Sequence, residues 1–198
     1  MKIWPRGALC CASLVFLLAG QVHAATVLEP SLKEAAGRYE ISPSSHINFS
    51  VGQVGGSSGI KGNYGKFSGT LNLDAGDVSH SVVTFSLMPE SVSAGEERVD
   101  NFLKSTAVFD AANFNAISFR SSDIKQTGPG TATVTGILTA KGHTRNETFD
   151  VKLTSWNGRS IAFDVRGDIL RSRYGMDVGT PIYSNVVRFE MAIEGQKK

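Results

Sequence analysis

The stretch Val187-Arg188-Phe189-Glu190-Met191-Ala192-Ile193 places an apolar side chain at every second position. Side chains alternate between the two faces of a β-strand, so this spacing predicts a half-buried strand over 186–194. Earlier segments share the same odd-numbered spacing, at Ile47, Phe49 and Val51, at Phe67, Leu71 and Leu73, and at Val83, Phe85 and Leu87. The pattern predicts an antiparallel sheet with an inner face rich in phenylalanine and valine, which has to close on itself or form a sandwich.

Turns containing Gly, Pro, Asn and Asp separate the candidate strands. We predict strands near 38–42, 46–53, 60–73, 80–88, 116–124, 131–138, 147–156, 159–169 and 186–194. Residues 94–105 differ, because Val99, Phe102 and Leu103 stand at helical spacing behind two glutamates that suit a helix start. The predicted fold is all-β, an antiparallel barrel of about eight strands with one inserted amphipathic helix. A barrel of this size is either filled by side chains or holds one small ligand.

The first 24 residues have the features of a secretory signal. A short basic start with Lys2 and Arg6 precedes an apolar run over 8–19, and small residues lead to Ala24. The run is shorter than the roughly 20 residues that span a membrane. We therefore expect a mature chain that begins at Ala25 and enters the periplasm without stable membrane insertion. A lead-in over 25–37 would precede one domain over 38–195.

Both cysteines, Cys10 and Cys11, lie inside the predicted signal. The mature chain would therefore have no disulfide in an oxidising compartment, so its stability must come from its core. Removal of the signal takes the Lys and Arg count from 20 to 18, which equals the 18 Asp and Glu residues. No basic stripe with interleaved aromatic residues remains, so we expect neither a nucleic-acid partner nor a polybasic membrane patch.

Candidate catalytic and metal-binding residues have simpler structural explanations. The run Gly55-Gly56-Ser57-Ser58-Gly59 matches Gly-x-Ser-x-Gly, but the nucleophile elbow needs a following helix and the next residues have no helical period. His46, His80 and His143 are dispersed, with no paired-ligand spacing and no cysteine to join them. We expect no catalytic residue, no metal site and no cofactor.

Several motifs in a fixed order resemble the YceI-like family of secreted bacterial lipid-binding proteins. The resemblance covers most of the predicted mature chain. Its motifs are Tyr39-Glu-Ile41, Ser45-His46-Ile47-Asn-Phe49, Phe67-Ser68-Gly69, Leu73-Asp74, Arg98, Asp100, Phe109-Asp110, Ile117-Ser-Phe119, Gly136-Ile-Leu138-Thr139 and Ile169-Leu-Arg171-Ser-Arg173-Tyr174-Gly175-Met176. The chain departs from the family pattern at Gln53-Val54-Gly55-Gly56, where a histidine is common, and at Val99, which separates Arg98 from Asp100.

The resemblance implies a lipocalin-like barrel whose lumen holds a long-chain amphiphilic lipid, such as a polyisoprenoid or an isoprenoid quinone. The expected wall positions are Phe49, Val51, Phe67, Phe85, Phe119, Phe149, Phe163 and Phe189. Phe102, Leu103 and Phe109 would close one end, and Tyr174 of the closing motif would also contact the ligand. Each of these side chains is equally compatible with ordinary core packing.

Two other classes of protein stay open at this stage. A structural or stress-associated interaction protein would have a barrel filled by side chains, whereas a carrier needs a continuous cavity. A hydrolase would need a base close to a nucleophile on one face. The sequence also leaves open whether a homodimer forms.

Overall fold

The computed structural model describes residues 30–56 and 59–198. The predicted signal, residues 25–29 of the lead-in, and Ser57 and Ser58 lie outside them. In the described chain the strands are β1 (Gly37–Ile41), β2 (His46–Gln53), β3 (Ile60–Tyr64), β4 (Phe67–Leu73), β5 (Val82–Leu87), β6 (Val92–Ser93), β7 (Ile117–Gly128), β8 (Thr131–Ala140), β9 (His143–Trp156), β10 (Ser160–Leu170) and β11 (Tyr183–Lys197). The helices are α1 (Glu97–Lys104) and three short 3₁₀ turns, η1 (Val78–His80), η2 (Pro89–Ser91) and η3 (Arg171–Tyr174).

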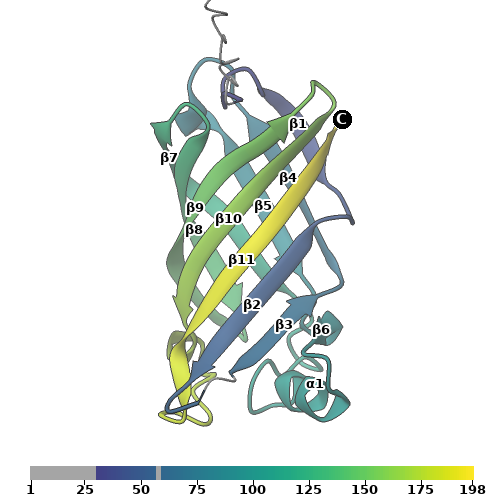
Figure 1. Ribbon diagram of the computed structural model, residues 1–198, viewed down its shortest axis with the longest axis vertical. Helices are drawn as coiled ribbons and strands as arrows, with labels where there is room; N and C mark the ends of the chain where they lie inside the picture. The colour runs from purple at the N-terminus through teal and green to yellow at the C-terminus, as the bar shows by residue number, and fades with distance from the viewer. Residues whose placement is uncertain (1–29, 57–58) are drawn as a thin grey trace, which may run out of the picture.

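The sheet closes into a barrel (Figure 1). All pairings are antiparallel, in the order β1-β4-β5-β7-β8-β9-β10-β11, and β11 returns to β1 through Ile41 opposite Gly195. The remaining strands β2, β3 and β6 continue the sheet from the other half of β11. Since β1 and β2 follow each other along one edge of β11, they share one position in the barrel. The all-β, roughly eight-stranded antiparallel barrel predicted from the sequence is confirmed.

The inner face follows the predicted alternation. Along β10, for example, Ile161, Phe163 and Ile169 are buried, whereas Asp164 and Arg166 between them are exposed. Several inner aromatic rings lie close to a glycine of a neighbouring strand. A Cβ added at Gly62 would come within 2.6 Å of the Phe49 ring, which lies opposite it across the β2–β3 ladder. Glycine at such positions makes room for large aromatic rings inside a narrow barrel.

The predicted single strand over 60–73 is wrong, because the chain bends between β3 and β4. The Gly65 N–H donates to the Ser91 carbonyl, and the Lys66 N–H donates to the Ser91 hydroxyl at 2.9 Å. This bend changes which residues face inward: the even-numbered Tyr64 is buried before it, and the odd-numbered Leu71 faces the interior after it. An unbroken strand would have placed Tyr64 on the outside.

The helix α1 lies beside β3 and β6 at the lower end of the barrel in Figure 1. It is shorter than the predicted 94–105, and Leu103 is its buried residue. Asp100 anchors it by accepting hydrogen bonds from the Ser93 hydroxyl at 3.1 Å and the Ala94 N–H at 2.5 Å. No helix in the described part of the chain is long and apolar enough to cross a membrane.

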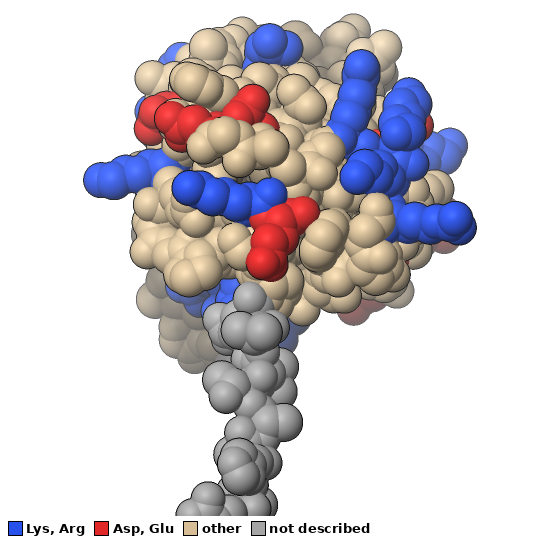
Figure 2. Space-filling view, turned by 90° about the horizontal axis from the view of Figure 1, so that it is seen from above, with Lys and Arg blue, Asp and Glu red and all other residues tan. Residues whose placement is uncertain are grey.

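The upper end of the barrel is closed by residues of the predicted lead-in. Leu32 and Ala35 are buried, and the Leu32 N–H donates to the carbonyl of Pro129 in the β7–β8 turn. The Tyr39 hydroxyl donates to the Ala35 carbonyl at 2.8 Å and accepts from the Trp156 indole N–H at 3.1 Å. Figure 2 looks onto this end, where basic and acidic side chains are interspersed.

Two aspartates in the turn between β4 and β5 make the stability of the protein depend on pH. Hydrogen bonds from the Asp77 and Gly76 N–H groups lower the pKa of the Asp74 carboxyl, and one from Ser79 N–H lowers the pKa of Asp77. A lowered folded-state pKa adds stability above the unfolded-state value of about 4, and this stability is lost as the pH falls through the folded-state value.

We therefore expect the wild type to be more stable than the double variant Asp74→Asn, Asp77→Asn near pH 6. The difference in their free energies of unfolding should shrink as the pH falls from about 4 to about 2. Urea denaturation midpoints of both proteins across this pH range measure the difference in stability. A difference that stays constant down to pH 2 would contradict the expectation.

Candidate functional site

The barrel encloses a cavity of about 290 Å³. The interior of an ordinary domain has few voids larger than a water molecule, which needs about 10–15 Å³. Every side chain on the cavity wall is apolar except Arg171 and the four tyrosines, and two glycines complete the wall. This free space disagrees with the alternative in which side chains fill the barrel.

Eleven of the twelve predicted site residues line the cavity. They are Phe49, Val51, Phe85, Phe102, Leu103, Phe109, Phe119, Phe149, Phe163, Tyr174 and Phe189. Phe67 does not line it: this residue begins β4 directly after the bend, and its ring stacks on Phe85 with 6.1 Å between centroids. Whether these residues contact a ligand stays a prediction.

The cavity reaches the surface at the lower end of the barrel. Phe102 and Val178 line it and are nevertheless 44% and 41% exposed, so they mark its mouth. At the other end, Leu32 and Val78 line it and are each 2% exposed. In the described part of the chain, the site is therefore an apolar tube with one open end. Its entrance lies between α1 and residues 175–182, the loop before β11, which we call the mouth loop.

Arg171 holds this loop together from inside the barrel. Its side chain is 9% exposed, and its donors bond to the carbonyls of Met176, Val178, Tyr183 and Ser184 and to the Thr180 hydroxyl. A guanidinium has five N–H donors, and these five bonds use all of its capacity. Burial lowers the pKa of Arg171, and the nearby charge of Asp177 acts in the opposite direction.

The chain matches the YceI-like domain over residues 39–195. It is 30% identical over 149 residues to a UPF0312 protein of Staphylococcus epidermidis, covering 69% of this chain and 84% of that protein. The chain belongs to the YceI-like family. A UPF0312 protein of Vibrio cholerae is 26% identical over 157 residues, covering 77% of this chain and 82% of the relative.

Solved structures share the YceI-like fold at lower identity. Burkholderia cenocepacia BcnA superposes with a TM-score of 0.72 at 23% identity, covering 78% of this chain and 98% of BcnA. A polyisoprenoid binding domain from Saccharophagus degradans superposes with a TM-score of 0.67 at 12% identity, covering 82% of this chain and 99% of that domain. At these identities the likeness establishes the barrel architecture.

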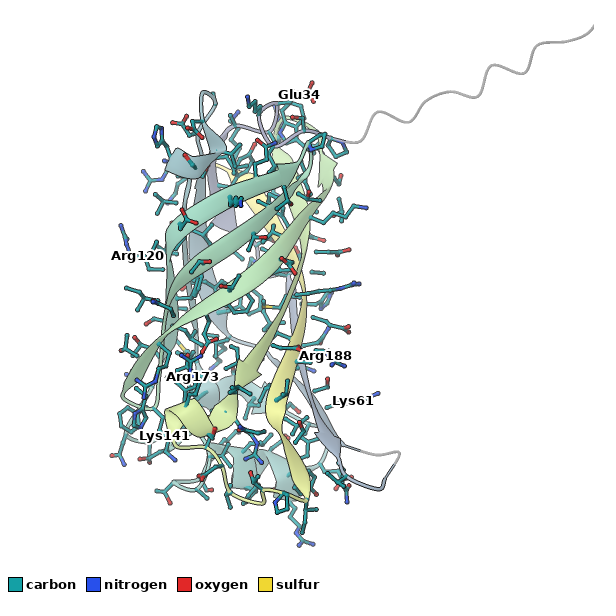
Figure 3. All side chains as sticks on the ribbon, turned by 90° about the vertical axis from the view of Figure 1, so that its left-hand side faces the viewer. Glu34, Lys61, Arg120, Lys141, Arg173 and Arg188 are labelled. Atoms are coloured by element: carbon teal, nitrogen blue, oxygen red, sulfur yellow. The ribbon has the colours of Figure 1, made fainter. Side chains whose placement is uncertain are left out.

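A buried polar pair near the mouth of this YceI-like barrel was not predicted. Glu147 is 8% exposed and accepts hydrogen bonds from the Tyr174 hydroxyl at 2.8 Å and from Arg173 at 3.0 Å. Burial is the main cause of the raised pKa of the Tyr174 phenol, and the hydrogen bond to Glu147 is the second cause. The signal was present in the sequence, because Glu147 has the same parity as Phe149 in a predicted strand. Figure 3 labels Arg173 near Lys141 at this lower end.

Tyr64 was also missed as a site residue, since the bend that buries it cannot be seen in the alternation. Its ring packs on Phe49 and Phe109, with centroids 5.5 Å and 6.0 Å away. Burial raises the pKa of its phenol. The side chain lines the cavity.

The three histidines do not belong to the cavity wall. His46, His80 and His143 are all exposed, and none of them lines the cavity. Ser57 and Ser58 lie outside the described residues, and the segment after them forms β3 in place of the helix that a nucleophile elbow needs. Among the described residues, no group of three or more His, Cys, Asp or Glu could hold a metal ion.

Proposed function

We propose that this protein is a periplasmic carrier that binds a long-chain amphiphilic lipid, a polyisoprenoid or an isoprenoid quinone, in the barrel lumen. The observation that carries the proposal is the apolar cavity of about 290 Å³, which is open at one end in the described residues. Each ~100 Å² of apolar ligand surface removed from water contributes about 2.5 kcal/mol. A long hydrocarbon chain can therefore bind such a wall without a charged recognition site.

The comparisons support the same class of ligand. The Saccharophagus degradans domain with this fold is a polyisoprenoid binding domain, and the family match covers nearly all of the barrel. The periplasmic location follows from the signal features of the first 24 residues. A single protomer holds the whole cavity, so the proposal does not require a homodimer.

Native mass spectrometry of the protein recovered from the periplasm of its own bacterium tests this function. We expect a mature chain that begins at Ala25 and carries one noncovalent adduct, which organic extraction releases as a lipid with a long unsaturated or saturated chain. As a control, delipidated protein is refolded and offered a fluorescent long-chain lipid. Recovery of the bare chain, together with no uptake by the refolded protein, would rule out the carrier.

A further inference from the structure

Three tyrosines are buried in the barrel, and only two of their hydroxyls have protein partners. Tyr39 bonds to Ala35 and Trp156, and Tyr174 bonds to Glu147. Tyr64 is 4% exposed, yet its hydroxyl makes no hydrogen bond within the described residues. Every side-chain oxygen of the described chain that is fully sealed from solvent has a partner. The Tyr64 oxygen must therefore keep some accessible surface, and the surface that its side chain lines is the cavity.

The position of Tyr64 is well defined by its neighbours. It is the last residue of β3, opposite Ile47 of β2 on one side and Val92 of β6 on the other. Both of these partners are buried. Strand pairing on two sides and ring contacts with Phe49 and Phe109 leave the phenol little freedom to turn toward another protein acceptor.

The surroundings of the Tyr64 hydroxyl restrict the chemistry of its partner. A buried water is held by two to four polar groups. The side chains that pair with or pack on Tyr64 are those of Ile47, Val92, Phe49 and Phe109, which are all apolar. Burial raises the pKa of the Tyr64 phenol, so the group keeps the proton that it can donate. Arg171 is the charged side chain on the described cavity wall, and all its donors are used by the mouth loop and the start of β11. An anionic group placed beside Tyr64 would therefore have no counter-charge.

We propose that Tyr64 is a specificity-determining residue that donates a hydrogen bond to a neutral acceptor oxygen, a carbonyl of ketone, ester or quinone type, carried on the bound apolar chain. This inference rests on the proposed lipid-binding function and names the polar group of its ligand. It selects a carbonyl-bearing chain over the pure hydrocarbon, because the hydrocarbon leaves the buried phenol unpaired.

Two ligands of one skeleton test this inference. Geranylgeranylacetone carries a ketone, and its matched hydrocarbon has a methylene in place of the carbonyl. Their affinities for wild type and Tyr64→Phe are measured by displacement of a fluorescent long-chain lipid. We expect Tyr64→Phe to weaken binding of the ketone about 5- to 30-fold and to leave binding of the hydrocarbon unchanged or slightly stronger.

An infrared measurement separates this role from a packing role. When the ¹³C-labelled ketone is bound to the wild type, its C=O stretching band should lie at lower wavenumber than in a hydrocarbon solvent. The Tyr64→Phe substitution should abolish this shift. An unshifted carbonyl in the wild type would overturn the inference even if the variant failed to fold. Equal losses for both ligands would also overturn it and leave lipid binding intact. Failure of the wild type to bind either ligand would overturn the proposed function itself.

Discussion

Replacing Val165 with tryptophan is expected to reduce the affinity for a long-chain lipid about 50-fold or more while the barrel stays folded. Val165 lies in β10 between Val151 and Met191 and lines the cavity. It is only half-buried although it faces inward, so its exposed surface belongs to the lumen. An indole at this position would occupy the space of the ligand, and each ~100 Å² of lost apolar contact costs about 2.5 kcal/mol.

The matched control for this lumen variant is Arg166→Trp. Arg166 is the next residue on the same strand and is exposed on the outer face. Both variants add the same ring to β10, and only one adds it to the cavity. Titration of delipidated protein with a fluorescent long-chain lipid measures the affinities, and circular dichroism checks the fold. Full lipid binding by a folded Val165→Trp protein would mean that the ligand lies somewhere else.

Replacing Arg171 with methionine is expected to lower the free energy of unfolding by about 2–4 kcal/mol. Methionine keeps an apolar side chain of similar reach but removes every donor that holds the carbonyls of Met176, Val178 and Tyr183. Arg171→Lys should recover only part of the loss, since an ammonium has three donors and no planar fork. The midpoint and slope of urea denaturation measure the change.

Arg188→Met is the control for the loss of an arginine from the same region of the barrel. Arg188 lies on the outer face of β11, where Figure 3 labels it, and pairs with Asp168 at 3.4 Å with both side chains more than half exposed. An exposed ion pair of this kind contributes about 0–1 kcal/mol. If Arg171→Met were no more destabilising than Arg188→Met, the mouth loop would be held by other contacts.

The alternation of residues predicted most of the cavity wall. Phe49, Phe85 and Phe189 were assigned to the inner face from spacing alone, and all three line the lumen. This works because the two-residue period of a strand is a local property of the backbone. A barrel of about eight strands follows from the number of such segments. The helix around Phe102 and Leu103 follows from a different local period.

Features that depend on contacts between distant segments could not be predicted in this way. The predicted single strand over 60–73 would have turned Tyr64 outward, but a bend turns it inward, and Ser91 stabilises this bend from 25 residues away. The five partners of Arg171 and the Tyr174 partner of Glu147 are likewise chosen by how the mouth loop folds back into the barrel.

The sequence by itself determined that the chain forms an antiparallel barrel with an aromatic inner face, because each strand records its buried side in its own alternation. Only the tertiary structure decided that the barrel holds free space, which end opens, and which of the buried tyrosines has a hydroxyl without a partner in the described residues. The free volume is the volume that the barrel backbone encloses minus the volume of the side chains that point inward from all its strands. That difference depends on register and on loops such as the one around Leu32, and no single segment contains it.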